Sequence, residues 1–181
     1  DTPADLGPAP ESVGPWPQAR ADAGNTGFVT AAGPTADPSL RWRVTSAGTV
    51  GASVGQSAGP ASPEHGRYIA GEDGRIAALD PDGGLRWQTR LSEARVPPAV
   101  GAGRVVVRAG DEVAVLDADT GDRSLSIDLP DGSLGTPTLV DARALVGTFS
   151  SGVVALDLES GTRRWQSGDP GRAHPPAVAD G

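Results

Sequence analysis

The sequence has no cysteine, no methionine and no lysine, and it lacks long apolar runs. Without cysteine, a disulfide framework and thiolate metal sites are excluded. Without a run of about 18 apolar residues, a membrane-spanning helix is not expected. Because methionine is absent even at position 1, we expect a processed chain, an excerpt of a longer protein or a fragment.

Basic residues are few, and all 15 of them are arginine, against 23 acids and a net charge of −8. This balance argues against nucleic acid as a partner, because phosphate binding needs a cationic face. An acidic, lysine-free composition predicts a halophilic protein, in which salt screens the self-repulsion of the carboxylates. A GC-rich genome that favours arginine, alanine, glycine and aspartate is the alternative explanation.

Helix-length stretches are scarce, because 26 glycines and 17 prolines interrupt the 181 residues. Short β-branched runs between turn residues remain, and they favour an all-β fold. Three of these runs share one pattern: IAALDPDGGLRW (76–87), VAVLDADTGDRSL (113–125) and VVALDLESGTRRW (153–165). In each, an apolar strand ends in Leu-Asp, an acid-rich turn with glycine follows, and a large apolar residue comes next. The repeat positions are Asp80, Gly84 and Trp87; Asp117, Gly121 and Leu125; and Asp157, Gly161 and Trp165.

A proline-led element recurs with the same period. The segments VPPAV (96–100), TPTLV (136–140) and HPPAV (174–178) place Pro98, Pro137 and Pro176 at intervals of 39 residues. With the apolar runs between them, each unit consists of four short strands. We expect a flexible Pro-rich linker at 1–15, a lead-in and the outer strand of a closing blade (with Trp42) at 16–47, blade units at 48–91, 92–130 and 131–168, and the first strand of a further unit at 169–181.

The acidic corner that begins at Asp117 has two interpretations, a cation site or a backbone turn. An EF-hand loop needs glycine at its sixth position and a bidentate glutamate at its twelfth. Counted from Asp117, Gly121 is fifth and Asp128 is twelfth. An aspartate at a strand end can instead accept from the N–H groups that follow it, with glycine in the left-handed position. We therefore predict turns, and no metal site, at all three corners.

The repeated pattern resembles the PQQ-like (pyrroloquinoline-quinone-like) β-propeller repeat family. The segments PPAVADG (175–181) and WPQARADAGNTGF (16–28) are also similar to its blade opening and its lead-in. The resemblance implies an all-β propeller of four-stranded antiparallel blades. For this chain we expect an N-terminal arc of three to four blades of a seven- or eight-bladed ring.

Candidate catalytic residues are few. Ser53 lies in GASVG, which matches a nucleophile elbow, but a helix does not follow. His65 and His174 have the surroundings of loop residues. In this family, quinoprotein dehydrogenases hold the quinone over calcium with Glu, Asn and Asp ligands and commonly a cysteine pair, whereas this chain has only Asn25 and no cysteine. We expect no catalytic, cofactor-binding or metal residue here.

The resemblance implies a non-catalytic protein-interaction scaffold, similar to the outer-membrane-assembly lipoproteins, at the cell surface or in the envelope. The alternative is part of a PQQ-dependent quinoprotein dehydrogenase whose cofactor site lies outside these residues. We expect protein partners, and association with another chain through open blade edges. The loops at 91–95, 130–135 and 168–174 are candidate contact loops, although a role as blade connectors is the favoured interpretation. Trp87 and Trp165 are expected to pack between blades.

Overall fold

The structure is a computed structural model. It describes residues 54–56 (backbone only), 67–71, 73–80, 82–94, 96–129, 131–167, 171–174 and 176–178. The predictions made for residues 1–53, including Trp42 and Ser53, and for His65 lie outside these ranges.

Twelve strands form three four-stranded sheets in the described residues, and no helix occurs there. Blade 1 contains β1 (Val54–Gln56), β2 (Arg67–Ala70), β3 (Arg75–Leu79) and β4 (Leu85–Arg90). Blade 2 contains β5 (Ala99–Gly101), β6 (Arg104–Ala109), β7 (Glu112–Asp117) and β8 (Arg123–Asp128). Blade 3 contains β9 (Ser133–Val140), β10 (Arg143–Thr148), β11 (Val153–Asp157) and β12 (Arg163–Gln166).

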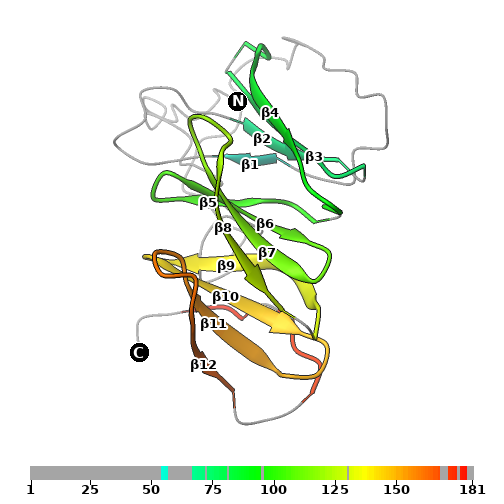
Figure 1. Cartoon of the computed structure of the whole chain (residues 1–181), viewed down its shortest axis with the longest axis vertical. Helices are drawn as coiled ribbons and strands as arrows, with labels where there is room; N and C mark the ends of the chain where they lie inside the picture. The colour runs from blue at the N-terminus through cyan, green and yellow to red at the C-terminus, as the bar shows by residue number, and fades with distance from the viewer. Residues whose placement is uncertain are drawn as a thin grey trace, which may run out of the picture.

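Each blade is an antiparallel meander, with its strands hydrogen-bonded in chain order. The three blades follow one another along the long axis of the molecule (Figure 1). The first strands lie on one side of this stack, where β1 contacts β5 and β5 contacts β9. The described residues therefore form an open arc of a propeller, which confirms the predicted all-β propeller fold. No helix that could cross a membrane is found in this part of the chain.

The middle blade is buried on both faces. On β6, Val105 and Val107 pack against blade 1, whereas Val106 packs against blade 3. All three side chains are fully buried. Because successive side chains of a strand point to opposite faces, only a continuous apolar run can serve two neighbouring sheets. The VVV run of the sequence therefore belongs to a strand between two blades.

A bulge recurs immediately before each Leu-Asp corner. The pairing of the third strand with the fourth shifts register between Ala78 and Leu79, between residues 115 and 116, and between residues 155 and 156. A bulge bends its strand and increases the local twist. The three units thus share a local irregularity as well as a sequence pattern.

Residues 171–174 and 176–178 lie against blade 3. The N–H of Ala173 donates to the carbonyl of Thr148 (2.9 Å), and the hydroxyl of Thr138 donates to the carbonyl of Pro176 (2.9 Å). Gly147 makes this approach possible, since a Cβ there would collide with the carbonyl oxygen of Ala173. Among the described residues of 169–181 the pairing is limited to an isolated bridge, Ser151–Gly171. That this segment begins a further unit stays a prediction.

Candidate functional site at the ends of the blades

Each Leu-Asp corner is organised by the carboxylate of its aspartate. Asp80 Oδ1 accepts from the N–H groups two and four residues later, both at 2.8 Å. Asp117 Oδ1 accepts from those two and three residues later, both at 2.9 Å. Asp157 Oδ1 accepts from the equivalent groups at 3.1 and 2.8 Å. These are the hydrogen bonds of Asx-type turns. Within the described ranges, no group of three or more His, Asp or Glu side chains is placed to hold a metal ion.

The glycine of the first corner differs from the prediction. Gly121 and Gly161 have φ of 78° and 71°, as expected for the left-handed position. In the first corner this position is occupied by Gly83 (φ 86°) and not by Gly84. The reason is that this turn is one residue shorter. The Asp80 carbonyl accepts from the N–H three residues later, on Gly83, whereas in the other two corners the carbonyl of the aspartate accepts from the N–H four residues later. Gly84 is needed for space, because a Cβ there would collide with the Asp80 carboxylate.

Asp157 is the most strongly bound of the three aspartates. Its Oδ2 accepts from Nε (2.9 Å) and Nη2 (2.6 Å) of Arg164. Hydrogen bonds from the backbone N–H of Ser160 and from the Arg164 guanidinium hold the pKa of Asp157 far below its usual range. Two backbone N–H donors also lower the pKa of Asp117. These carboxylates therefore favour the folded state in their ionised form.

We predict that Asp157→Asn flattens the acid limb of the stability curve. A lowered pKa in the folded state contributes stability above the unfolded pKa of about 3.9, and this contribution is lost as pH falls toward the folded value. The wild-type free energy of unfolding should therefore fall more steeply between about pH 5 and 3 than that of the variant. Urea unfolding at a series of pH values measures both slopes. Asp122→Asn, at an exposed turn residue, is the control; equal slopes in wild type and Asp157→Asn would contradict the prediction.

A hydrogen-bonded aromatic pair locks blade 1 to blade 2. The ring of Trp87 lies directly on Gly121, where a Cβ would be 2.5 Å from ring atom Cε3. The indole Nε1–H donates to the carbonyl of Ala118 (2.9 Å), and the Tyr68 hydroxyl donates to the same oxygen (3.1 Å). The two ring centroids are 5.9 Å apart. Trp87 is 9% exposed, so it packs between blades as expected.

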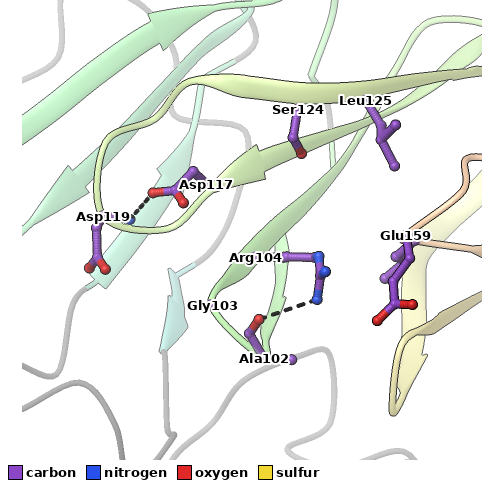
Figure 2. Close-up of a pocket in the computed structure, with 9 residues that line it drawn as sticks. Ala102, Gly103, Arg104, Asp117, Asp119, Ser124, Leu125 and Glu159 are labelled. Carbon is purple, nitrogen blue, oxygen red and sulfur yellow. Dashed lines mark hydrogen bonds between the residues drawn. The ribbon is translucent and has the colours of Figure 1, made fainter.

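Leu125 occupies the equivalent place between blades 2 and 3. It lies 3.5 Å from the Cβ position of Gly161, a looser contact than that of Trp87 on Gly121. Beside it is an open hollow of about 570 Å³ (Figure 2). Arg104 lies in this hollow between the Asp117 corner and Glu159, and its guanidinium donates to the carbonyl of Ala102 (3.4 Å). The hollow is lined by Ala102, Gly103, Arg104, Asp117, Asp119, Ser124, Leu125, Leu158 and Glu159.

Trp165 has the third of these positions but is 49% exposed, which differs from the predicted interblade packing. It pairs with Ala155 on β11, as Trp87 pairs with Ala78 on β3. The physical reason for its exposure is that the described residues contain no blade beyond β12 that would cover the ring. Trp165 lines a second hollow of about 340 Å³ together with Arg143 and Arg164.

At the opposite end of blade 3, an aromatic ring is exposed on the hairpin after β10. Phe149 is 48% exposed, and the Arg172 guanidinium carbon lies 5.5 Å from its ring centroid, in a cation–π contact. The backbone of Gly132 supports the ring, since a Cβ there would be 3.0 Å from it. Asp131 accepts a hydrogen bond from the Ser151 hydroxyl and links the two loops. The Phe149–Arg172 pair is thus an exposed feature on a braced backbone.

The predicted contact loops have different environments. Loops 130–135 and 168–174 contribute Gly132 and Arg172 to the Phe149 surface. In loop 91–95, however, Leu91 and Ala94 are only 8% and 0% exposed, because they belong to the core between blades 1 and 2. Residues 91–94 thus connect two blades, which is the favoured of the two interpretations of this loop. His174 has an exposed side chain in the segment over blade 3, as expected of a loop residue.

Comparison with known proteins identifies the family. The family model described as "Outer membrane protein assembly factor BamB" matches residues 26–174, most of the chain. The chain belongs to the BamB family. This confirms the PQQ-like resemblance that the repeated Leu-Asp corners indicated.

Curated BamB proteins align over a limited part of their length. BamB of Bordetella pertussis is 31% identical over 117 residues, which cover 61% of this chain and 30% of that protein. BamB of Burkholderia pseudomallei is 33% identical over 120 residues, covering 61% and 31%. The chain thus spans about a third of the BamB relatives that it matches.

Solved structures support the fold. The crystal structure of BamB from Moraxella catarrhalis has a TM-score of 0.51 at 24% identity and covers 56% of this chain and 33% of that one. A europium-containing methanol dehydrogenase has a TM-score of 0.56 at 17% identity and covers 87% and 32%. Propellers of an assembly factor and of a dehydrogenase therefore share this blade architecture, and the fold alone does not separate their functions.

Two features of the site were not found from the sequence. The Phe149–Arg172 contact joins residues from different loops, and no local pattern predicts such a pairing. The other feature is Tyr68, the chain's only tyrosine, whose hydroxyl is the second donor to Ala118 beside the Trp87 indole. It lies in the second strand of the unit, where the next unit has the valines of 105–107, and an alignment of the repeats could have shown this difference.

Proposed function

We propose that this chain is part of a non-catalytic BamB-like propeller that binds partner proteins in the cell envelope. Membership of the BamB family supports this proposal, since the curated relatives are outer membrane protein assembly factors. The corners support it as well, because their carboxylates bind the backbone and shape turns. Stacked blades with buried cores make a rigid support on which end loops present contact residues.

The exposed Phe149–Arg172 pair is the observation that carries the proposal. Aromatic residues and arginine are enriched at the energetically dominant positions of protein interfaces. Here the ring is braced by Gly132 below and by the guanidinium at its face, so little conformational entropy remains to be lost on binding. A partner segment that covers the ring would bury apolar surface, and a carboxylate on it could accept hydrogen bonds from Arg172.

We predict that the double variant Phe149→Ala/Arg172→Ala loses partner binding without losing the fold. Truncation of interface hot spots costs about 2 kcal/mol or more, which is at least about 30-fold in affinity. Affinity capture of the tagged whole protein from crosslinked native envelopes measures the recovery of a stoichiometric partner. Leu85→Ala is the matched control, because Leu85 is 58% exposed on β4 of blade 1. Equal recovery with both variants would contradict the assignment of this surface.

A dehydrogenase assay tests the scaffold function itself. The whole protein is incubated with pyrroloquinoline quinone, calcium, a primary alcohol and an artificial electron-accepting dye. We expect no dye reduction above that of the quinone without protein. Saturable alcohol oxidation would contradict the non-catalytic assignment and favour a quinoprotein whose cofactor site lies outside these residues.

A further inference from the structure

The internal repeat allows the two blade junctions to be compared position by position. On blade 1, the side that meets blade 2 carries Tyr68, Arg86 and Trp87. On the side of blade 2 that meets blade 3, the equivalent positions by strand pairing are Val106, Ser124 and Leu125. Each replacement is smaller, and none has a hydrogen-bond donor that reaches as far. The hollow in Figure 2 lies beside these smaller side chains, with Ser124 and Leu125 in its wall.

The acceptor at the first junction also has an equivalent at the second. Ala118 is the residue after the corner aspartate of blade 2, and its carbonyl accepts from both Trp87 and Tyr68. Leu158 is the residue after the corner aspartate of blade 3, and it lines the hollow. The N–H of Leu158 donates to the carbonyl of Ala142 (2.9 Å). In the same way, the N–H of Ala118 donates to the carbonyl of Gly103 (3.0 Å). Residues 158 and 118 therefore have the same backbone setting, but blade 2 supplies no indole or phenol to residue 158.

Charged groups flank the hollow in the same way. At the first junction, Nη2 of Arg86 contacts Asp119 at 3.1 Å. At the second, Glu159 replaces Asp119, and the nearby guanidinium comes from Arg104, at the start of β6. Arg104 has only the long contact to Ala102 among the hydrogen bonds of the described residues. Its guanidinium is thus available to lie over an aromatic face.

We propose that this hollow is a docking site for a tryptophan side chain of a partner polypeptide. The indole would lie beside Leu125, in the part of the Trp87 position that the smaller leucine leaves empty, with its N–H directed to the carbonyl of Leu158 and its face near Arg104. About 570 Å³ is within the usual range of roughly 300–1,000 Å³ for pockets that hold compact ligands. A buried aromatic anchor in such a pocket is the common form of an interface hot spot. This inference rests on the proposed protein-binding function and specifies one contact of it.

A peptide titration tests the docking site directly. The probe is acetyl-Gly-Trp-Gly-amide, with acetyl-Gly-Leu-Gly-amide as its matched control, added to the ¹⁵N-labelled chain. We expect saturable amide shifts at Leu125, Glu159 and Gly161 with the tryptophan peptide and at least about tenfold weaker effects with the leucine peptide. The first junction, at Ala118 and Gly121, should not respond. Equal effects of the two peptides, or shifts that map elsewhere, would overturn the proposal.

Two variants make the test independent of folding. Leu125→Trp should fill the hollow with the chain's own indole, abolish the peptide shifts and raise the melting temperature. Arg104→Gln, at a partly exposed side chain, should fold normally and weaken the tryptophan peptide at least threefold. Unchanged affinity in both variants would overturn the proposal. If a partner is captured from envelopes but the tryptophan peptide does not bind, the docking site is refuted and the scaffold function is not. If the peptide binds but no partner is captured, the scaffold function is refuted and the docking site is not.

Discussion

Replacing Trp87 by alanine is expected to lower the free energy of unfolding by about 3–5 kcal/mol. The ring is 9% exposed and packs on the Gly121 backbone, so its removal leaves a cavity between blades 1 and 2. The Ala118 carbonyl also loses the indole donor and keeps only the Tyr68 hydroxyl. Because domains are stable by only about 5–15 kcal/mol, a loss of this size removes a large share of the total.

The same substitution at Trp165 is the matched control. Trp165 has the equivalent position of its repeat and the equivalent alanine partner on the neighbouring strand, but its ring is 49% exposed. Trp165→Ala should cost less than about 1 kcal/mol. Urea unfolding followed by far-UV circular dichroism measures both variants without depending on tryptophan emission. Equal losses would show that the Trp87 ring does not hold the two blades together.

The features that could be predicted from the sequence have local causes. An aspartate at a strand end followed by glycine builds the same turn wherever the strands around it continue, and the corners at Asp117 and Asp157 have that geometry. The apolar run at 105–107 also has a local cause, because a strand that lies between two sheets has no face on which a polar side chain could reach water. Both features depend only on residues that are close in the sequence or on the directly neighbouring sheets.

The features that could not be predicted depend on residues far apart in the chain. The loop around Leu91 and Ala94 has the composition of an exposed connector, yet blade 2 packs over it. Trp87 and Trp165 have the same sequence context, but within the described residues a neighbouring blade covers Trp87 and none covers Trp165. Phe149 and Arg172 meet because residues 171–174 lie along blade 3, which no turn signal in the sequence specifies.

Gly121→Ala is expected to destabilise the fold by about 2–5 kcal/mol. A non-glycine residue at φ near +78° costs about 1–2 kcal/mol in backbone strain. The new Cβ would also lie 2.5 Å from Cε3 of Trp87, and overpacking of this kind costs about a further 1–3 kcal/mol. The ring has little freedom to move, because its Nε1–H is bound to Ala118. Urea unfolding at neutral pH measures the loss.

Gly161→Ala separates strain from collision. Its φ of 71° is nearly the same, but the nearest atom to its Cβ position, Leu125 Cδ2, is at an ordinary 3.5 Å. This variant should therefore cost only the strain, about 1–2 kcal/mol. In a Trp87→Leu background the first junction acquires the leucine–glycine pair of the second, so the added cost of Gly121→Ala should fall to the same value. If Gly121→Ala costs as much in that background as in wild type, the indole is not the atom group that requires glycine at the corner.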